Sequence, residues 1–223
     1  NANSLGIAYI ASYLNKRGHD AWLYNADYVS DYGYIKIKKI FSNFNSYKDY
    51  FKDLDNAIWH EVKDNILRFK PDWVGYTSYT ANISAIKIIS DKVKKVNPSI
   101  KQVVGGVHAT LDSDILKTLT SIDYSIQREG EEALTALVEN KNPKYIPGVV
   151  SRDTGGILFK TGIAPVIKDI NNLPMPEREK FWNIPDDEKK NVDVSYVNSI
   201  RGCPYKCTYC ASPFHWDRKT TRL

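Results

Sequence analysis

The sequence contains no apolar run of about 18 residues, so no transmembrane helix is expected. It also lacks a basic start followed by an apolar stretch and a small-residue cleavage site, which excludes a recognisable secretory signal. Only three cysteines occur among its 223 residues, and an odd number cannot form a closed disulfide framework. These absences favour a reducing compartment, and we expect a cytoplasmic protein.

The composition that is present suits a folded chain, with 42% hydrophobic and 26% charged residues. The length predicts one large domain or two small ones, long enough to bury a core without disulfide or metal support. The net charge is +5, and residues 200–223 carry five basic side chains against one acidic one. Because the basic character is concentrated in this last segment, it gives little support to a nucleic-acid partner.

Apolar periodicity predicts helices alternating with strands through residues 5–139. The expected helices cover residues 5–16, 55–69, 83–96, 110–119 and 130–139, with Asp55 and Asn82 as N-caps of the second and third. The expected strands cover residues 21–26, 72–77, 100–104 and 124–126, and residues 28–54 are expected to form helical pieces with an irregular link. Such alternation predicts a parallel sheet covered by helices on both faces.

The pattern changes after residue 142. Segments 146–152 and 157–160 flank Asp153-Thr154-Gly155-Gly156 and predict a β-hairpin. A turn-rich stretch follows, and residues 192–200 predict a further strand. We therefore expect a domain over residues 1–165, a linker over 166–191 and the start of a second domain over 192–223. The chain begins without Met and ends shortly after its cysteines, so we expect it to be a piece of a longer protein.

All three cysteines fall within eight residues, at Cys203, Cys207 and Cys210. One loop can fold three such thiolates around a single inorganic centre, and cysteine thiolates are the chief ligands of iron–sulfur clusters. Structural zinc sites instead usually close with four ligands. A zinc knuckle completed by His215 is therefore the alternative interpretation.

Three predicted strands end in residues that are suited to bind a ligand, because open parallel sheets bind ligands at the carboxyl ends of their strands. These residues are Ser78 and Thr80 after the first, Gly105, Gly106 and His108 after the second, and Glu129 and Glu131 after the third. Each group also has a purely structural interpretation: a helix cap, a plain turn, or acids that complement a helix dipole.

The cysteine spacing, with Gly202 before it, Tyr209 inside it and Ala211-Ser212-Pro213 after it, resembles the signature of radical S-adenosylmethionine enzymes. The resemblance implies that Cys203, Cys207 and Cys210 bind a [4Fe–4S] cluster whose fourth iron chelates S-adenosylmethionine. It also implies that the motif follows the first strand of a TIM-like barrel, which assigns residues 192–200 to that strand.

The preceding domain resembles the B12-binding domain of one large subfamily of these enzymes. The matching pieces are Leu5–Leu14 with Arg17-Gly18-His19, Gly105–Thr110, Glu129–Glu131, Ile146–Val149 and Leu173–Pro176. The resemblance implies a flavodoxin- or Rossmann-like doubly wound α/β sheet that lacks its first strand, with cobalamin over the carboxyl ends of the strands. The implied cobalamin contacts are Ser78, Thr80, Gly105, Gly106, His108, Glu129 and Glu131.

One family feature is missing. Cobalamin proteins that ligate cobalt through histidine carry Asp-x-His-x-x-Gly, and the sequence has no such stretch. We therefore expect cobalamin to bind without a histidine lower ligand.

The sequence thus predicts the N-terminal part of an enzyme that reductively cleaves S-adenosylmethionine to a 5′-deoxyadenosyl radical, for methyl transfer to unactivated carbon or for oxidative cyclisation. The resemblance implies a small-molecule substrate and an electron donor such as flavodoxin or ferredoxin, and residues 1–223 alone are expected to be inactive. Two alternatives remain: a non-catalytic nucleotide- or flavin-binding α/β module with a zinc knuckle, and a radical enzyme that modifies RNA.

Overall fold

A five-stranded mixed sheet forms the centre of the computed structural model, which describes residues 4–26, 28–29, 33–34, 44–181, 183–184, 186, 198–216 and 220–222. The strands lie in the order β3 (Trp73–Thr77), β4 (Lys101–Gly105), β5 (Tyr124–Ile126), β6 (Val149–Arg152) and β7 (Leu158–Lys160). The first three are parallel, and β6 and β7 join antiparallel. The three parallel strands and the hairpin were both predicted, and the α/β fold class is confirmed.

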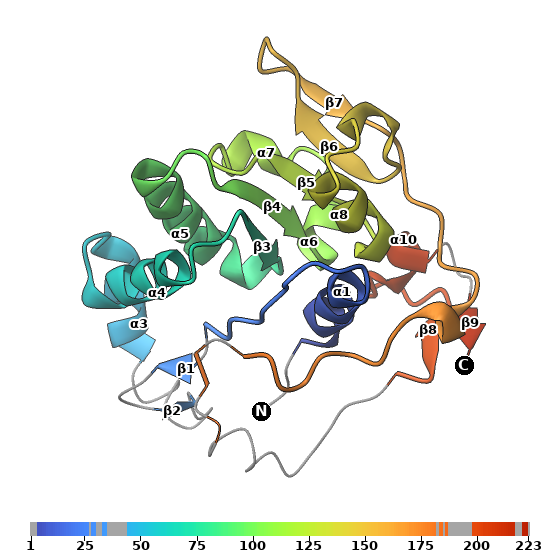
Figure 1. The fold of residues 1–223 in the computed structure, drawn as a ribbon, viewed down its shortest axis with the longest axis horizontal. Helices are drawn as coiled ribbons and strands as arrows, with labels where there is room; N and C mark the ends of the chain where they lie inside the picture. Colours follow the sequence, from blue (N-terminus) through green and yellow to red (C-terminus); the bar gives the residue numbers. More distant parts are fainter. Residues whose placement is uncertain are drawn as a thin grey trace.

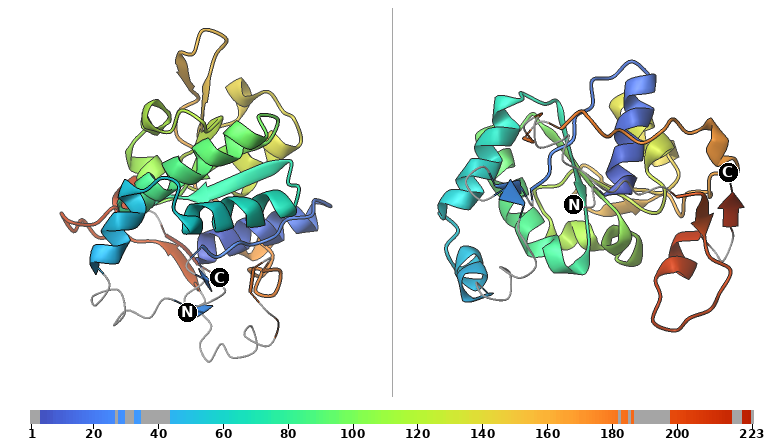
Figure 2. Two further views of the ribbon diagram at one scale, coloured as in Figure 1. Left: turned by 90° about the vertical axis from the view of Figure 1, so that its left-hand side faces the viewer. Right: turned by 90° about the horizontal axis from the view of Figure 1, so that it is seen from below.

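Helices cover both faces of this sheet (Figures 1 and 2). Successive strand residues point to opposite faces, and in β4 Val104 packs with Ile86 of α5 (Ile83–Val96) while Val103 packs with Leu137 of α8 (Glu131–Val138). Further helices complete the layers: α1 (Leu5–Lys16) lies against α8, and α4 (Ala57–Arg68) lies against α5. The core is therefore two apolar layers separated by the sheet.

Several helix boundaries differ from the predicted ones. The cap of α4 is Asn56, whose side chain accepts the Ile58 N–H, and not Asp55. Asn82 makes no cap bond to α5, because its side chain instead closes the short 3₁₀ turn η1 (Thr80–Asn82) through Tyr79. The helix expected over residues 110–119 is two helices, α6 (Val107–Leu111) and α7 (Ile115–Thr118).

The segment expected as a strand over residues 21–26 forms only an isolated parallel bridge, between Leu23 and Phe181. Beyond it, β1 (Tyr28–Val29) pairs antiparallel with β2 (Gly33–Tyr34), and α3 spans Phe44–Lys52. Two parts of the segment predicted over residues 28–54 lie outside the described residues, namely 30–32 and 35–43.

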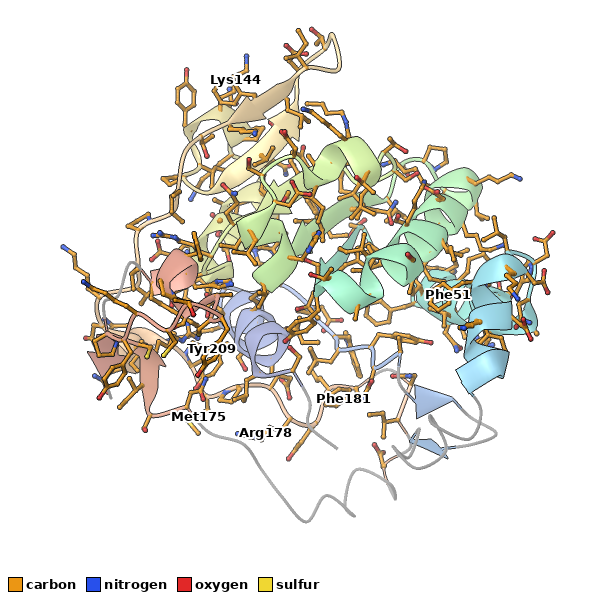
Figure 3. All side chains as sticks on the ribbon, turned by 180° about the vertical axis from the view of Figure 1, so that it is seen from behind. Phe51, Lys144, Met175, Arg178, Phe181 and Tyr209 are labelled. Carbon is orange, nitrogen blue, oxygen red and sulfur yellow. The ribbon has the colours of Figure 1, made fainter. Side chains whose placement is uncertain are left out.

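The linker does not leave the α/β domain but packs back onto it. The Glu177 N–H donates to the Ala8 carbonyl at 3.0 Å, and the Leu23 N–H donates to the Lys180 carbonyl at 2.8 Å. Phe181, labelled in Figure 3, is buried together with Ile184 against Ala8, Ala11 and Leu23. Two short 3₁₀ turns, η2 (Pro143–Tyr145) and η3 (Ile170–Asn172), lie before this contact.

The cysteine segment lies between two short strands, β8 (Ile200–Gly202) and β9 (Thr220–Arg222), which pair antiparallel. Helix α10 (Ser212–Trp216) follows the last cysteine. Most of the strand predicted over residues 192–200 lies outside the described residues. Among the residues that are described, no helix is long and apolar enough to cross a membrane.

Candidate functional site

The three parallel strands end at one edge of the sheet, at Thr77, Gly105 and Ile126, and the predicted ligand-binding residues follow these ends directly. The cysteine segment reaches the same edge, because α10 contacts α6, the helix that begins just beyond β4. We call this edge, where β3, β4 and β5 end, the carboxyl edge. The structure thus brings both predicted sites together.

Ser78 is fully buried and uses its hydroxyl within the protein. Its Oγ donates to the Gly105 carbonyl at 2.7 Å and accepts the Ala109 N–H at 3.1 Å. The Ser78 carbonyl also accepts the His108 N–H at 3.1 Å. Ser78 therefore ties α6 to the ends of β3 and β4, and its hydroxyl is not presented to a ligand as the sequence suggested.

Gly106 is required by the packing of these same chain segments. Its φ of +96° is one that side chains rarely adopt, and a Cβ there would lie 2.9 Å from the Ser78 backbone nitrogen. Gly105 differs, since a Cβ there would meet only the Ile126 carbonyl oxygen at 3.6 Å, an ordinary contact. Both glycines shape the carboxyl edge, but only Gly106 is excluded from carrying a side chain.

Thr80 and His108 are the predicted residues that remain open to a ligand. The Thr80 hydroxyl and the His108 Nδ1 lie 3.0 Å apart in a hydrogen bond, with Thr80 exposed and His108 half-buried. Tyr79 is exposed beside them. A hydroxyl, an imidazole and a phenol therefore face outward where β3 and β4 end, and they can hydrogen-bond a polar ligand.

Glu129 and Glu131 are engaged in a manner that the sequence did not suggest. Glu129 Oε1 accepts Arg201 Nη1 at 2.8 Å, and Glu131 Oε1 accepts Arg201 Nη2 at 2.7 Å. The side chains are only 7%, 4% and 11% exposed for Glu129, Glu131 and Arg201. These carboxylates thus bind the arginine that precedes the first cysteine and do not face an open ligand site.

The electrostatics of this cluster are those of a buried guanidinium between two carboxylates. Burial alone would lower the pKa of the Arg201 guanidinium, but the two carboxylates outweigh burial and raise that pKa above its usual value. The guanidinium also lies 4.7 Å from the centre of the Tyr9 ring on α1. Arg201 and Tyr9 were not predicted as site residues; for Arg201 the available signal was a basic residue two positions before Cys203.

The three cysteines are free thiols on one loop, with Cys203 and Cys210 half-buried and Cys207 exposed. The Cys210 N–H donates to the Cys207 carbonyl at 3.2 Å, and the Ser212 N–H lies 3.4 Å from Cys210 Sγ, a contact of the kind that tunes cluster thiolates. Within the described ranges, no three His, Cys, Asp or Glu side chains are grouped closely enough to hold a metal ion. The donor set fits an iron–sulfur cluster in chemistry, and the exposed loop can be reached from solvent.

His215, the proposed fourth ligand of a zinc knuckle, is buried in α10. Burial, together with the positive charge of Arg128, lowers the pKa of His215 below its usual value. Its Nε2 has no hydrogen-bond partner among the residues that the structure describes.

A cavity of about 360 Å³ lies at the opposite edge of the sheet, where β3 and β4 begin. Trp73, Lys101 and Asn97 are among the residues that line it. None of the predicted site residues contributes to this cavity, so it is separate from the carboxyl edge.

Comparisons with known proteins agree with this geometry. A family model described as the B12 binding domain matches residues 2–138. The anaerobic magnesium-protoporphyrin IX monomethyl ester cyclase of Rubrivivax gelatinosus is 30% identical over 168 residues, which cover 70% of this chain and 30% of the cyclase. The chain therefore spans about a third of the length of that relative.

Two solved structures share the fold. The radical S-adenosylmethionine methyltransferase TsrM from Kitasatospora setae matches all of this chain and 40% of its own, with a TM-score of 0.61 and 14% identity. The cobalamin-dependent S-adenosylmethionine radical enzyme OxsB matches 99% of this chain and 27% of its own, with a TM-score of 0.63 and 16% identity. The chain belongs to the B12-binding domain family, and its fold is shared with the matching parts of TsrM and OxsB.

Proposed function

We propose that the chain is the N-terminal part of a cobalamin-binding radical S-adenosylmethionine enzyme. The observation that carries this proposal is the position of the three-cysteine loop at the carboxyl edge of a B12-binding sheet, tied there through Arg201 and α10. The proposed reaction is one-electron reductive cleavage of S-adenosylmethionine to methionine and a 5′-deoxyadenosyl radical. The radical then serves methyl transfer to unactivated carbon or oxidative cyclisation.

The proposed roles follow from the chemistry of the residues. Cys203, Cys207 and Cys210 would hold a [4Fe–4S] cluster, which supplies the electron and leaves one iron open to S-adenosylmethionine. Thr80 and His108 would hydrogen-bond cobalamin at the carboxyl edge, where Gly105 and Gly106 let the backbone approach closely. We assign Ser78, Glu129 and Glu131 to the framework of that edge, since their polar groups already have protein partners.

The remaining parts of the proposal concern the substrate, the electron donor and the location of the enzyme. They are a small-molecule substrate, an electron donor such as flavodoxin or ferredoxin, and a cytoplasmic location. The relatedness to a cyclase supports oxidative cyclisation, and the fold shared with a methyltransferase is compatible with methyl transfer.

The cluster is tested by anaerobic reconstitution of the chain with iron and sulfide. We expect about four irons per chain, with a brown colour and a reducible paramagnetic signal. Cys207→Ala should lose most of this iron, whereas Thr208→Ala, an exposed neighbour, should retain it. Bound zinc in place of iron would refute the cluster and favour the knuckle, and equal iron in both variants would refute Cys207 as a cluster ligand.

Cobalamin binding is tested by titrating the chain with hydroxocobalamin. Thr80→Ala and His108→Ala should weaken binding, whereas Lys101→Gln, at the opposite end of β4, should leave it unchanged. The spectrum of the bound cofactor should have the same shape in the wild type and in His108→Ala, because no histidine lower ligand is proposed. No spectral change at saturating cofactor would contradict cobalamin binding.

A further inference from the structure

One four-residue segment, Arg128–Glu131, contacts the cysteine loop on both of its flanks. It follows the end of β5 and leads into α8. Its side chains bind Arg201, two residues before Cys203, and Phe214, four residues after Cys210. We call Arg128–Glu131 the clamp segment.

The first flank is held by a fork of charged hydrogen bonds. The two terminal nitrogens of Arg201 each reach a different carboxylate, at 2.8 Å for Glu129 and 2.7 Å for Glu131. The second oxygen of Glu129 accepts the Ile167 N–H at 2.6 Å, which fixes that carboxylate independently of Arg201. A planar guanidinium can satisfy two carboxylates at once, whereas the point charge of a lysine cannot reproduce this geometry.

The second flank is held by Arg128, whose Nε donates to the Phe214 carbonyl at 3.0 Å. Arg128 adopts a φ of +68°, and its own N–H donates to the Thr110 hydroxyl at 2.8 Å. The surrounding structure therefore specifies an unusual backbone conformation at this position. The consequence is that Arg128 and Glu129, adjacent in the chain, point to opposite flanks of the cysteine loop.

The clamp contacts are separate from the apolar cores of the α/β domain. The two layers on either side of the sheet consist of aliphatic and aromatic residues, and Arg201 belongs to neither. The ion pairs join the sheet to a segment 70 or more positions later in the sequence. Desolvation offsets much of the Coulombic gain of a buried ion pair, so we infer that these contacts serve chiefly to fix the position of this segment.

We propose that Arg201 is a positioning residue, which the clamp segment uses to hold the three cysteines against the carboxyl edge so that a cluster can assemble there. This inference rests on the proposed function for the identity of the cluster. The clamp itself is a property of the metal-free chain and can be measured without any metal.

The first test measures the alkylation rate of Cys203 by iodoacetamide in the metal-free chain, with peptide mass spectrometry to assign the site. Arg201→Met should raise this rate at least about fivefold, because the loop opens locally more often. The matched control is Arg17→Met, since Arg17 also lies over a tyrosine ring and pairs with a glutamate, but at an exposed site far in sequence from the cysteines. Equal Cys203 rates in the wild type and in Arg201→Met would overturn the proposal.

The second test asks whether Arg201 acts through the carboxylates. Glu131→Gln, Arg201→Met and the double variant form a cycle. The double variant also removes one of the two buried carboxylates that Arg201→Met leaves without an ion pair, while Glu129 keeps its hydrogen bond from the Ile167 N–H. We expect the double variant to have no faster Cys203 alkylation than Arg201→Met alone, and Arg201→Lys to recover only part of the protection. Additive effects, or full recovery by lysine, would contradict the fork geometry.

The third test measures iron per chain and the paramagnetic signal after reconstitution. Arg201→Met should bind less than about half of the wild-type iron if positioning assists assembly. A wild type that binds no cluster, but whose Cys203 is protected by Arg201, would refute the proposed function and leave the clamp standing. Altered alkylation with unchanged iron and an unchanged signal would refute the role in cluster assembly.

Discussion

Replacing Gly106 with alanine tests how tightly the carboxyl edge is built. The new Cβ would lie 2.9 Å from the Ser78 nitrogen, 3.0 Å from its carbonyl oxygen and 3.0 Å from Thr77 Oγ1. Two of these three atoms belong to the backbone and cannot rotate away. Strain at a φ of +96° and overpacking together predict a loss of about 2–5 kcal/mol in the free energy of unfolding.

Gly105→Ala is the matched control, because it adds the same methyl group one residue earlier without a positive φ or a close contact. Its effect should be about 0.5 kcal/mol or less in either direction. Urea unfolding of both variants, followed by far-UV circular dichroism in the absence of cofactors, compares them directly. If the two variants differ by less than about 1 kcal/mol, the account of Gly106 is wrong.

Two further predictions concern polar groups away from the site. Arg152→Met should lower the free energy of unfolding by about 2 kcal/mol, because the guanidinium donates to the carbonyls of Leu116, Leu119 and Ile122 where α7 ends. Arg152→Lys should recover part of this loss. An unchanged urea midpoint in Arg152→Met would contradict the prediction. Burial raises the pKa of Tyr76, so the contribution of its neutral phenol to stability is complete below the unfolded pKa of about 10 and is lost as the pH rises above that value. The free energy of unfolding measured in urea should therefore decline at alkaline pH, and Tyr76→Phe should make this decline less steep. An equally steep decline in Tyr76→Phe would refute this cause.

The positions of the parallel strands could be predicted because each is short, apolar and closed by a glycine or polar turn. The split of the helix expected over residues 110–119 could not, since its cause is local polar bonding. Asp112 Oδ1 accepts the Asp114 N–H at 2.9 Å and ends α6 after a single turn. The apolar residues keep the same spacing across this break, so their periodicity predicted one continuous helix where there are two.

The candidate site was predicted in location but only partly in role. The glycines and hydroxyls were expected at the ends of the parallel strands and lie there, and ligand binding by them stays a prediction. The roles of Glu129 and Glu131 depended on Arg201, and no local pattern reveals a partner 70 or more positions away. Ser78 shows the same limit, because a buried hydroxyl with two protein partners and an exposed one have the same sequence signature.

The packing of Phe181 and Ile184 against Ala8 and Ala11 of α1 has a consequence for how the protein can be divided. A boundary at residue 165, where the composition changes, would remove Phe181 and Ile184 from the apolar cluster that they share with Ala8 and Leu23. An α/β domain cut at that point would present bare hydrophobic surface to water, and such surfaces promote aggregation. Part of the hydrophobic interior of the N-terminal unit is therefore supplied by Phe181 and Ile184, which belong to the segment that leads to the cysteines.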